Sequence, residues 1–437
     1  MTTRPIEAST RVRARARARL ATAALATARL GTATLASATL VTAALAPAAR
    51  AQTLPVTVVN DTGIKGPMYI TVLGRKPSDT SVHIYSDANG NVKPFTVNPT
   101  PTNYGFSTSA QTYTFHIPQM SSARIYVSFC APAWTTASKT GDVPPQIAPN
   151  TPAPWVPTDK NFQTVLDFAE FDWVPAGTGS SMDIDTTQVD SLSIPMTLSL
   201  SGKPGGKATT LVSGFKNKAT SVLVVPGLAT KPWNNLVVYD AKKRPIRIIA
   251  PEHAMALAPS QANYFPNNQL DSYIDKVFTT FAKPGKTFSI KADDGTLYTG
   301  KVQNGQMVLT PNTSNPPNLF NKPSTLYVWQ NGAPPAGGPA AAVPGLQKYI
   351  QAAFLRSTFL NTTTSSLSTC QGVVPYALPP QNLYSSTIHA LSINQGAYTF
   401  PYDDVCARSS NISLTDPTSV TLTLLPLSAS MATMSCK

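Results

Sequence analysis

Apolar and polar residues alternate in short runs along most of the chain from Leu54 onward, which is the period of half-buried β-strands. Turns rich in Pro, Asn, Ser and Gly separate the runs, which favours a β-sandwich or barrel. The predicted strands of the first half are PVTVVN (55–60), MYITVL (68–73), SVHIYS (81–86), VKPFTV (92–97), QTYTFHI (111–117), ARIYVSF (123–129), SIPMTLSL (193–200) and KATTLV (207–212). Between them, residues 131–160 are predicted to be a Pro/Thr/Ala-rich connection.

The pattern changes in the second half. After a predicted hairpin at 234–250, the segment 268–285 repeats apolar residues at helical spacing until Lys283-Pro284-Gly285 ends the helix. A three-strand meander is predicted at 287–310, with turns at Asp294-Gly295 and Asn304-Gly305. A second helix is predicted at 345–359, and strands at 387–393, 397–402 and 419–427.

We therefore expect a mainly β protein in which the C-terminal strands return to the first core. The predicted domains are a β-sandwich or barrel formed by 52–215 and 380–437, and a mixed α/β domain at 216–379. The chain has 437 residues, enough for two such cores.

The net charge of +13 suggests a polyanion partner until its distribution is considered. Residues 1–51 contain eight arginines and one acid, so they hold +7, and the remaining 386 residues hold +6. That remainder is scattered, and its densest cluster, AKKRPIR (241–247), fits a hairpin turn. No strand interleaves lysines with aromatic residues, so we predict no nucleic-acid partner.

Residues 1–51 have the composition of a secretion signal, with a basic stretch, an apolar run around 35–45 and small residues before Gln52. We expect cleavage near Ala51 and a secreted or periplasmic protein with no membrane contact after cleavage. A transit peptide is the alternative. Export makes one or two disulfides plausible among Cys130, Cys370, Cys406 and Cys436, which allow three pairings.

One acid-rich stretch stands out because only 13% of the residues are charged. LDFAEFDW (166–173) and MDIDTTQVD (182–190) hold six of the 21 acids within 24 residues. Glycoside hydrolysis needs a protonated carboxyl as acid and an ionised carboxylate as base. Glu170, among the aromatic residues Phe168, Phe171 and Trp173, suits the acid, and Asp190, after a polar run, suits the base. The alternative is a solvated loop with a calcium site at Asp183 and Asp185.

The pattern FAEFDW…DTTQVDSLSIPMTL resembles glycoside hydrolase family 64, the thaumatin-like β-1,3-glucanases. PVTVVNDTGIKGPMYITVLG, ARIYVSF, LDSYIDKVF and IHA…AYTFPYDDV also match, in order, along nearly the whole chain after residue 51. The resemblance implies a thaumatin-like β domain beside a mixed α/β domain, with a wide groove for a β-1,3-glucan chain. It also implies inverting endo-hydrolysis that releases short laminari-oligosaccharides.

The resemblance also assigns residues. Its general acid falls on Glu170 and its general base on Asp190, while Asp172 and Thr187 fall at sugar-contacting positions. In PYDDV (401–405), Asp403 or Asp404 would line the groove and bind sugar hydroxyls, although an Asp pair after a strand is otherwise a turn cap. The sequence departs from the family at 182–184, where Met-Asp-Ile replaces an expected groove aromatic.

We thus expect a monomeric β-1,3-glucan hydrolase that needs no cofactor or metal. The alternative is a thaumatin-like protein that binds β-glucan without cleaving it, for which the departure at 182–184 is the main support. Trp134, Trp155, Trp233 and Trp329 are candidates for stacking on sugars, although each is more often a core residue.

Overall fold

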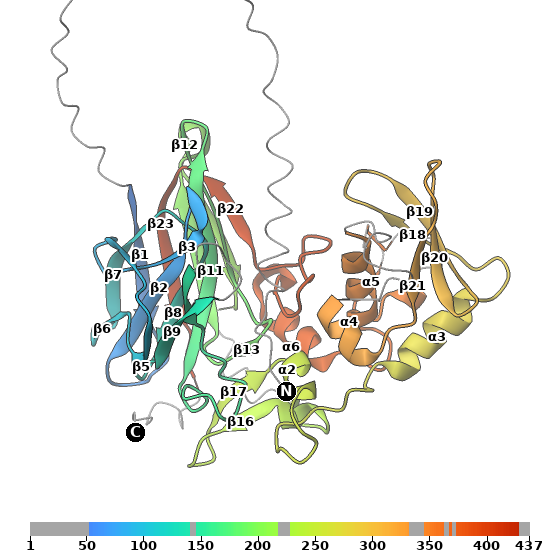
Figure 1. Ribbon diagram of the computed structural model, residues 1–437, viewed down its shortest axis with the longest axis horizontal. Helices are drawn as coiled ribbons and strands as arrows, with labels where there is room; N and C mark the ends of the chain where they lie inside the picture. Colours follow the sequence, from blue (N-terminus) through green and yellow to red (C-terminus); the bar gives the residue numbers. More distant parts are fainter. Residues whose placement is uncertain are drawn as a thin grey trace, which may run out of the picture.

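The computed structural model describes residues 52–139, 146–216, 228–331, 345–361, 367–368 and 373–427. It is mainly β, as predicted, with two large sheets at one side of the molecule and helices gathered at the other (Figure 1). The predicted signal at 1–51 lies outside the described residues. Among the described residues, no helix combines the length and the apolar character needed to cross a bilayer.

The first large sheet has five strands in the order β15-β14-β23-β1-β7. Its strands are β1 (Thr53–Asn60), β7 (Thr112–Pro118), β14 (Met196–Gly202), β15 (Thr209–Gly214) and β23 (Pro417–Leu424). The segment predicted at 419–427 thus forms a central strand, which runs parallel to β1 and antiparallel to β14.

The second large sheet has eight strands in the order β22-β12-β11-β8-β2-β3-β4, with β6 paired to β2. Its strands are β2 (Met68–Lys76), β3 (Asp79–Ser86), β4 (Val92–Pro94), β6 (Phe106–Thr108), β8 (Met120–Ser128), β11 (Leu166–Ala176), β12 (Gly179–Thr186) and β22 (Ile412–Thr415). Alternate residues of both sheets enter one apolar core, for example Val56 and Val58 from β1 and Ile70 and Val72 from β2.

Three smaller sheets complete the β structure. The segment 131–160, predicted to be a connection, contains β9 (Trp134–Lys139) and β10 (Gln146–Asn150), which pair with β5 (Asn98–Thr102). The predicted hairpin at 234–250 forms β16 (Val237–Tyr239) and β17 (Pro245–Ile249), and β13 (Ser191–Leu192) adds to β17.

The predicted meander is confirmed and gains a fourth strand. It consists of β18 (Phe288–Lys291), β19 (Leu297–Gln303), β20 (Gln306–Pro311) and β21 (Asn318–Asn321). At the β19–β20 turn both Asn304 and Gly305 have positive φ, 51° and 76°, as a tight two-residue hairpin turn requires.

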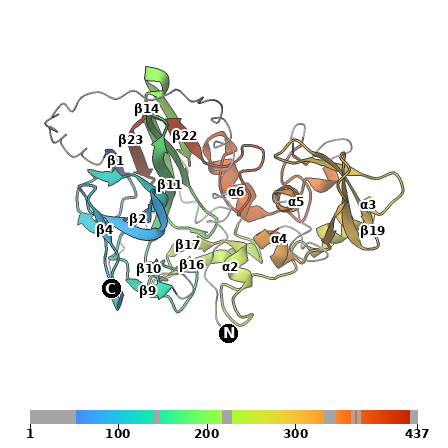
Figure 2. The same cartoon turned by 45° about the horizontal axis from the view of Figure 1, so that its top comes forward.

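Helices lie beside this meander and between it and the large sheets (Figures 1 and 2). The helices are α2 (Pro251–Met255), α3 (Asp271–Phe281), α4 (Thr325–Asn331), α5 (Leu346–Leu355) and α6 (Leu383–Leu391), with 3-10 turns η2 (Pro204–Gly206), η5 (Trp233–Leu236), η6 (Phe359–Asn361) and η7 (Ile393–Gln395). The helices predicted at 268–285 and 345–359 are α3 and α5. Of the five helices, α2 and α6 lie nearest to the large sheets in both views.

Two strand predictions near the C-terminus are wrong. Residues 387–393 lie in α6 and η7, because Asn382 caps a helix by accepting a hydrogen bond from the Ser385 N–H at 3.0 Å. Residues 397–402 form no strand, because Pro401 has no N–H to pair and Thr399 instead bonds to Asp403.

The described residues include two of the four cysteines. Cys130 and Cys406 each take part in a disulfide bond. Cys370 and Cys436 lie outside the described residues.

Candidate active site

The acid-rich stretch forms two paired strands, β11 and β12, next to the edge strand β22 of the eight-stranded sheet. Along β11, Ala169, Phe171 and Trp173 enter the main core. By the two-residue period of a strand, Glu170 points to the opposite face, which it shares with Phe168. The predicted aromatic surround of Glu170 is therefore wrong for Phe171 and Trp173.

An arginine accompanies Glu170 on that face. Arg124 of β8 lies directly opposite Glu170 in the strand register. Its Nε donates to Glu170 Oε1 at 3.0 Å, and its Nη2 lies 3.0 Å from the same oxygen. The guanidinium also covers the Phe168 ring at 4.3 Å from the centroid. Cross-strand pairing thus fixes the orientation of the Glu170 carboxylate.

Asp190 comes to the site from a different element. It immediately precedes β13, which pairs with β17 through Ser191 and Ile249. The pairing continues one residue further, because the Ala250 N–H donates to the Asp190 carbonyl at 3.0 Å. Helix α2 begins at the next residue, so the small sheet places α2 beside Asp190.

His253 of α2 holds the Asp190 side chain. Its Nε2 lies 2.9 Å from Asp190 Oδ1, and its ring stacks on Trp155 at a centroid distance of 4.2 Å and an angle of 11°. A carboxylate can only accept, so Nε2 carries the hydrogen in this bond. Burial disfavours the charged form of Asp190, but the hydrogen bond and charge of His253, with the charge of Arg124, keep its pKa below the ordinary value.

The residue before His253 is Glu252, the acidic residue of α2. Burial raises the pKa of Glu252 to about 7, against the opposing effect of His253, and nearby Asp190 raises it further. The environments of these two carboxyls therefore shift their pKa values in opposite directions. At neutral pH Asp190 is ionised and Glu252 is close to half protonated.

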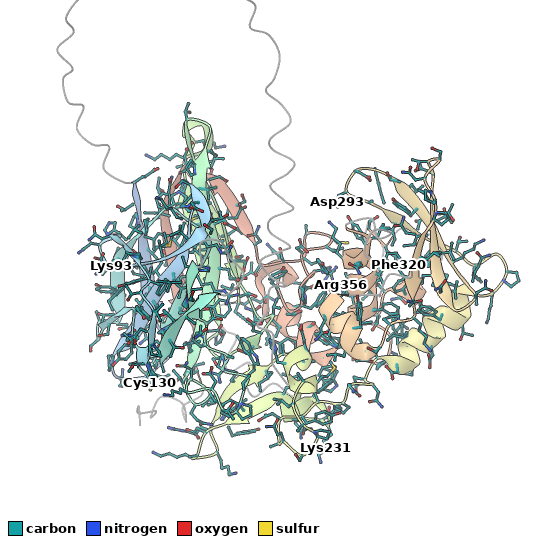
Figure 3. The ribbon with its side chains drawn as sticks, viewed as in Figure 1. Lys93, Cys130, Lys231, Asp293, Phe320 and Arg356 are labelled. Carbon is teal, nitrogen blue, oxygen red and sulfur yellow. The ribbon has the colours of Figure 1, made fainter. Side chains whose placement is uncertain are left out.

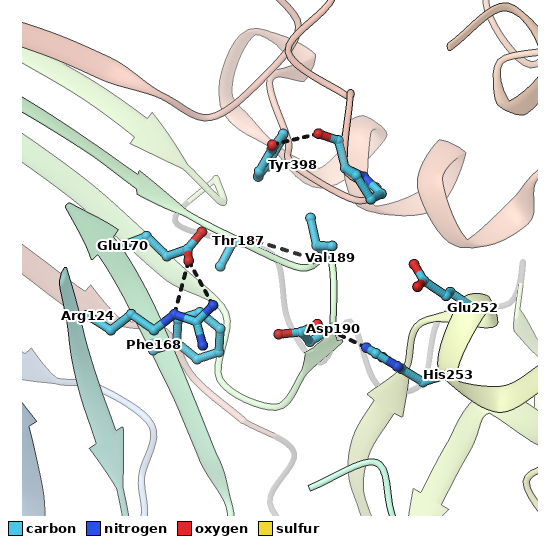
Figure 4. Close-up of a pocket in the computed structure, with 10 residues that line it drawn as sticks. Arg124, Phe168, Glu170, Thr187, Val189, Asp190, Glu252, His253 and Tyr398 are labelled. Atoms are coloured by element: carbon cyan, nitrogen blue, oxygen red, sulfur yellow. Dashed lines mark hydrogen bonds and ion pairs between the residues drawn. The ribbon is translucent and has the colours of Figure 1, made fainter. Parts of the chain in front are cut away.

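These side chains line one pocket with a volume of about 20 Å³ (Figure 4). Such a volume accommodates about one water molecule, so a sugar would lie at the mouth of the pocket and not inside it. The lining residues are Arg124, Phe168, Glu170, Thr187, Val189, Asp190, Glu252, His253, Tyr398 and Pro401. In the close-up, Glu170 and Asp190 project toward the same space from β11 and from the start of β13.

The structure brings three of the six predicted site residues together. Glu170, Asp190 and Thr187 line the pocket, whereas Asp172, Asp403 and Asp404 do not. Asp172 accepts a hydrogen bond from the Ser122 N–H at 2.8 Å. Asp404 is exposed in the turn that follows Pro401.

Asp403 is fully buried, which leaves its carboxylate no contact with solvent. Its oxygens accept from Arg356 Nη2 at 2.8 Å, His389 Nε2 at 2.8 Å and Thr399 Oγ1 at 2.6 Å. Arg356 also donates to the Val405 carbonyl, and it lies between the large sheets and the meander (Figure 3). Asp403 therefore fixes the loop that carries Tyr398 and Pro401 instead of facing the pocket.

The family departure at 182–184 does not reach the pocket. Met182 and Ile184 are fully buried in the main core on β12. Of the four tryptophans considered for sugar stacking, Trp134, Trp233 and Trp329 are also buried, and Trp155 packs on His253. Within the described ranges, no group of three or more His, Cys, Asp or Glu residues could hold a metal ion.

The sequence analysis missed Arg124, Glu252, His253 and Tyr398. Long-range pairing brings Arg124 to Glu170, which no local pattern could indicate. A signal for Glu252 was present, however. Residues 52–437 contain two glutamates, Glu170 and Glu252, and both line this pocket.

Comparison with known proteins identifies the family of the chain. The family model described as Beta-1,3-glucanase, for glycoside hydrolase family 64, matches residues 52–424. Glucan endo-1,3-beta-glucosidases of Arthrobacter sp. (strain YCWD3) and Cellulosimicrobium cellulans are each 24% identical over 382 residues, which are 86% of this chain. This chain spans 65% of the length of those curated relatives.

Solved structures show the same fold. A laminaripentaose-producing beta-1,3-glucanase in complex with laminaritetraose superposes with a TM-score of 0.71 and 25% identity, covering 86% of this chain and 99% of its own. A beta-1,3-glucanase domain (GH64) from Clostridium beijerinckii superposes with a TM-score of 0.66 and 23% identity, covering 87% and 100%. On the match of 52–424, this chain belongs to glycoside hydrolase family 64.

Proposed function

We propose that this protein hydrolyses β-1,3-glucan within the chain, with inversion at the anomeric carbon, and releases short laminari-oligosaccharides. The main support is that Glu170 on β11 and Asp190 before β13 line the same pocket. The chain that contains them belongs to family 64. The names of the relatives, glucan endo-1,3-beta-glucosidase and laminaripentaose-producing beta-1,3-glucanase, support the substrate class.

In this mechanism Glu170 donates a proton to the glycosidic oxygen as the bond to the anomeric carbon breaks. A water molecule attacks that carbon from the opposite face, and Asp190 accepts its proton. The lowered pKa of Asp190 keeps it ionised and ready as a base. The pocket beside Asp190 has room for the attacking water.

Arg124 has a positioning role in this scheme. Its Nε and Nη2 both contact Oε1 of Glu170 and so orient the carboxyl that would donate the proton. Thr187 at the pocket wall is suited to bind a sugar hydroxyl.

The test is incubation of residues 52–437 with laminarin and curdlan, with proton NMR of the first products. We expect release of oligosaccharides whose new reducing ends are in the α configuration. Glu170→Gln and Asp190→Asn should each reduce release by at least about a thousandfold, in the range of lost acid–base catalysis. Asp183→Asn on β12, which removes a carboxylate that does not line the pocket, is the matched control. Products of retained configuration, or equal rates in Glu170→Gln and wild type, would exclude the mechanism.

A second candidate is a protein that binds β-glucan without cleaving it. The Arg124–Glu170 ion pair favours it, because a carboxylate oriented by an arginine can accept hydrogen bonds from sugar hydroxyls without transferring a proton. The departure at 182–184 no longer supports it, since Met182 and Ile184 lie in the core and Asp183 does not line the pocket. Retention on insoluble curdlan with no release of reducing sugar would identify this function.

We further propose that the glucan extends along a wide groove between a thaumatin-like β domain and the mixed α/β domain. We also propose that the protein is secreted as a monomer after cleavage near Ala51. N-terminal sequencing of the exported protein and size-exclusion chromatography test cleavage and oligomeric state.

A further inference from the structure

Glu252 is the one pocket carboxyl to which the proposed mechanism gives no role. It belongs to the first turn of α2, directly after Pro251, and it is partly exposed. The close-up shows its carboxyl across the pocket from Val189, above the Asp190–His253 pair (Figure 4). In a chain with so few acids, its place beside Asp190 needs an explanation.

The backbone fixes this placement. The Ala250 N–H donates to the Asp190 carbonyl and α2 starts one residue later, so the pairing of β13 with β17 places the backbone of Glu252 beside the pocket. His253, the next residue, is held by both Asp190 and Trp155. Glu252 itself makes no hydrogen bond or ion pair to another described residue. Its carboxyl is thus positioned by its neighbours and available to a ligand.

We propose that Glu252 contacts the glucan directly and donates a hydrogen bond to a hydroxyl of the sugar bound over Asp190. This inference rests on the proposed function and adds a third substrate-facing carboxyl to it. A protonated carboxyl both donates and accepts, which matches a sugar hydroxyl that does the same. Such a contact would set the orientation of one sugar unit relative to the base.

Protonation of the Glu252 carboxyl explains why a second acid can lie beside Asp190. With its pKa raised to about 7, Glu252 is mostly neutral below that pH, so it adds no charge beside Asp190. Above it, a bound glucan would remove water from an ionised carboxyl that already faces Asp190, which weakens binding. The other titratable groups at the pocket are His253, Glu170, Arg124 and Tyr398, and α4, which packs on α2, carries Tyr327.

The experiment measures binding separately from catalysis. Laminaritetraose is titrated by calorimetry into Glu170→Gln protein at about pH 5.5 and about pH 8.5, on either side of the pKa of Glu252. We expect the Kd to rise about five- to tenfold between the two, the size of one hydrogen bond. Adding Glu252→Gln should make the Kd nearly independent of pH. Adding Glu252→Ala should weaken binding at both values.

The matched control adds Asp275→Asn instead, which removes an exposed carboxylate of α3 and should keep the pH dependence. Circular dichroism confirms that each variant is folded. If the pH dependence persists in the Glu252→Gln protein, Asp190 or His253 causes it and the inference is overturned. Unchanged affinity in the Glu252→Ala protein would overturn it as well. Failure of the Glu170→Gln protein itself to bind laminaritetraose at either pH would reject the proposed function, and the sugar contact with it.

Discussion

Replacing His253 tests whether its hydrogen bond to Asp190 keeps that carboxylate ionised, as a general base must be. His253→Phe keeps a ring to stack on Trp155 but removes the Nε2 donor, which lies 2.9 Å from Asp190 Oδ1. His253→Gln keeps an N–H donor at a similar reach and loses the stacking. His253→Ala loses both, so the three variants separate the hydrogen bond from the packing.

The magnitude follows from the partners. A hydrogen bond to a charged group stabilises by about 1.5–3 kcal/mol, and Asp190 and His253 are both buried. If that stabilisation acts on the ionised base, its loss lowers kcat/KM about 10- to 100-fold. Because His253 lowers the pKa of Asp190, removing the donor raises that pKa. Less base is then ionised at low pH, and activity recovers as pH rises.

The assay is the pH dependence of kcat/KM on laminarin, followed by reducing-sugar release from about pH 4 to pH 9. We expect the acid limb of the profile to move to higher pH in His253→Phe and His253→Ala, and to stay closer to wild type in His253→Gln. Thermal unfolding separates the stacking, because His253→Ala should be less stable than His253→Phe by about 0.5–1.5 kcal/mol.

One result would refute this reasoning. If His253→Phe has the acid limb of wild type and a similar kcat/KM, then the hydrogen bond does not set the ionisation of the catalytic base. Either Asp190 is held ionised by another group or it is not the base.

Two further substitutions concern residues that position the pocket, Arg124 beside Glu170 and Asp403 in the loop that carries Tyr398. Arg124→Met removes both N–H groups that orient Glu170, so we expect kcat to fall at least about tenfold with a smaller change in KM, and Arg124→Lys to restore part of it by keeping the charge. Asp403→Asn leaves the Arg356 charge uncompensated in the interior, so it should lower the unfolding free energy by about 3–5 kcal/mol in urea titration. The neighbouring exposed Asp404→Asn should change that energy by less than about 0.5 kcal/mol, and an equal effect of the two would contradict the buried role of Asp403.

Patterns within a few neighbouring residues correctly predicted several strands, the helices α3 and α5, and a turn. The alternation along β1 and β2, the helical period of α3 and the Asn-Gly turn of the meander all appear where the sequence places them. The same reasoning failed for α6, because β-branched Thr and Ile suggested a strand while the decisive cap, Asn382, lies five residues earlier. Cap chemistry outweighs propensity in a short helix.

The sequence predicted Glu170 and Asp190 but not the residues that contact them. Glu170 and Asp190 carry the family pattern, but their partners come from pairings that span large distances along the chain. Arg124 reaches Glu170 through the β8–β11 register, and His253 reaches Asp190 through the β13–β17 register. Because register depends on the whole sheet, no window of the sequence contains it. The burial of Asp403 could not be predicted for the same reason, since its partner Arg356 lies at the end of α5.

The position of β23 has a consequence for how the protein is made. Residues 417–424 separate β1 from β14, so during synthesis the two flanking parts of that sheet exist before the strand that joins them. Each part exposes an unpaired edge until residues 417–424 have left the ribosome. The sandwich core can therefore close only after residues 417–424 have been synthesised, and a chain stopped before Pro417 would lack the middle of this sheet.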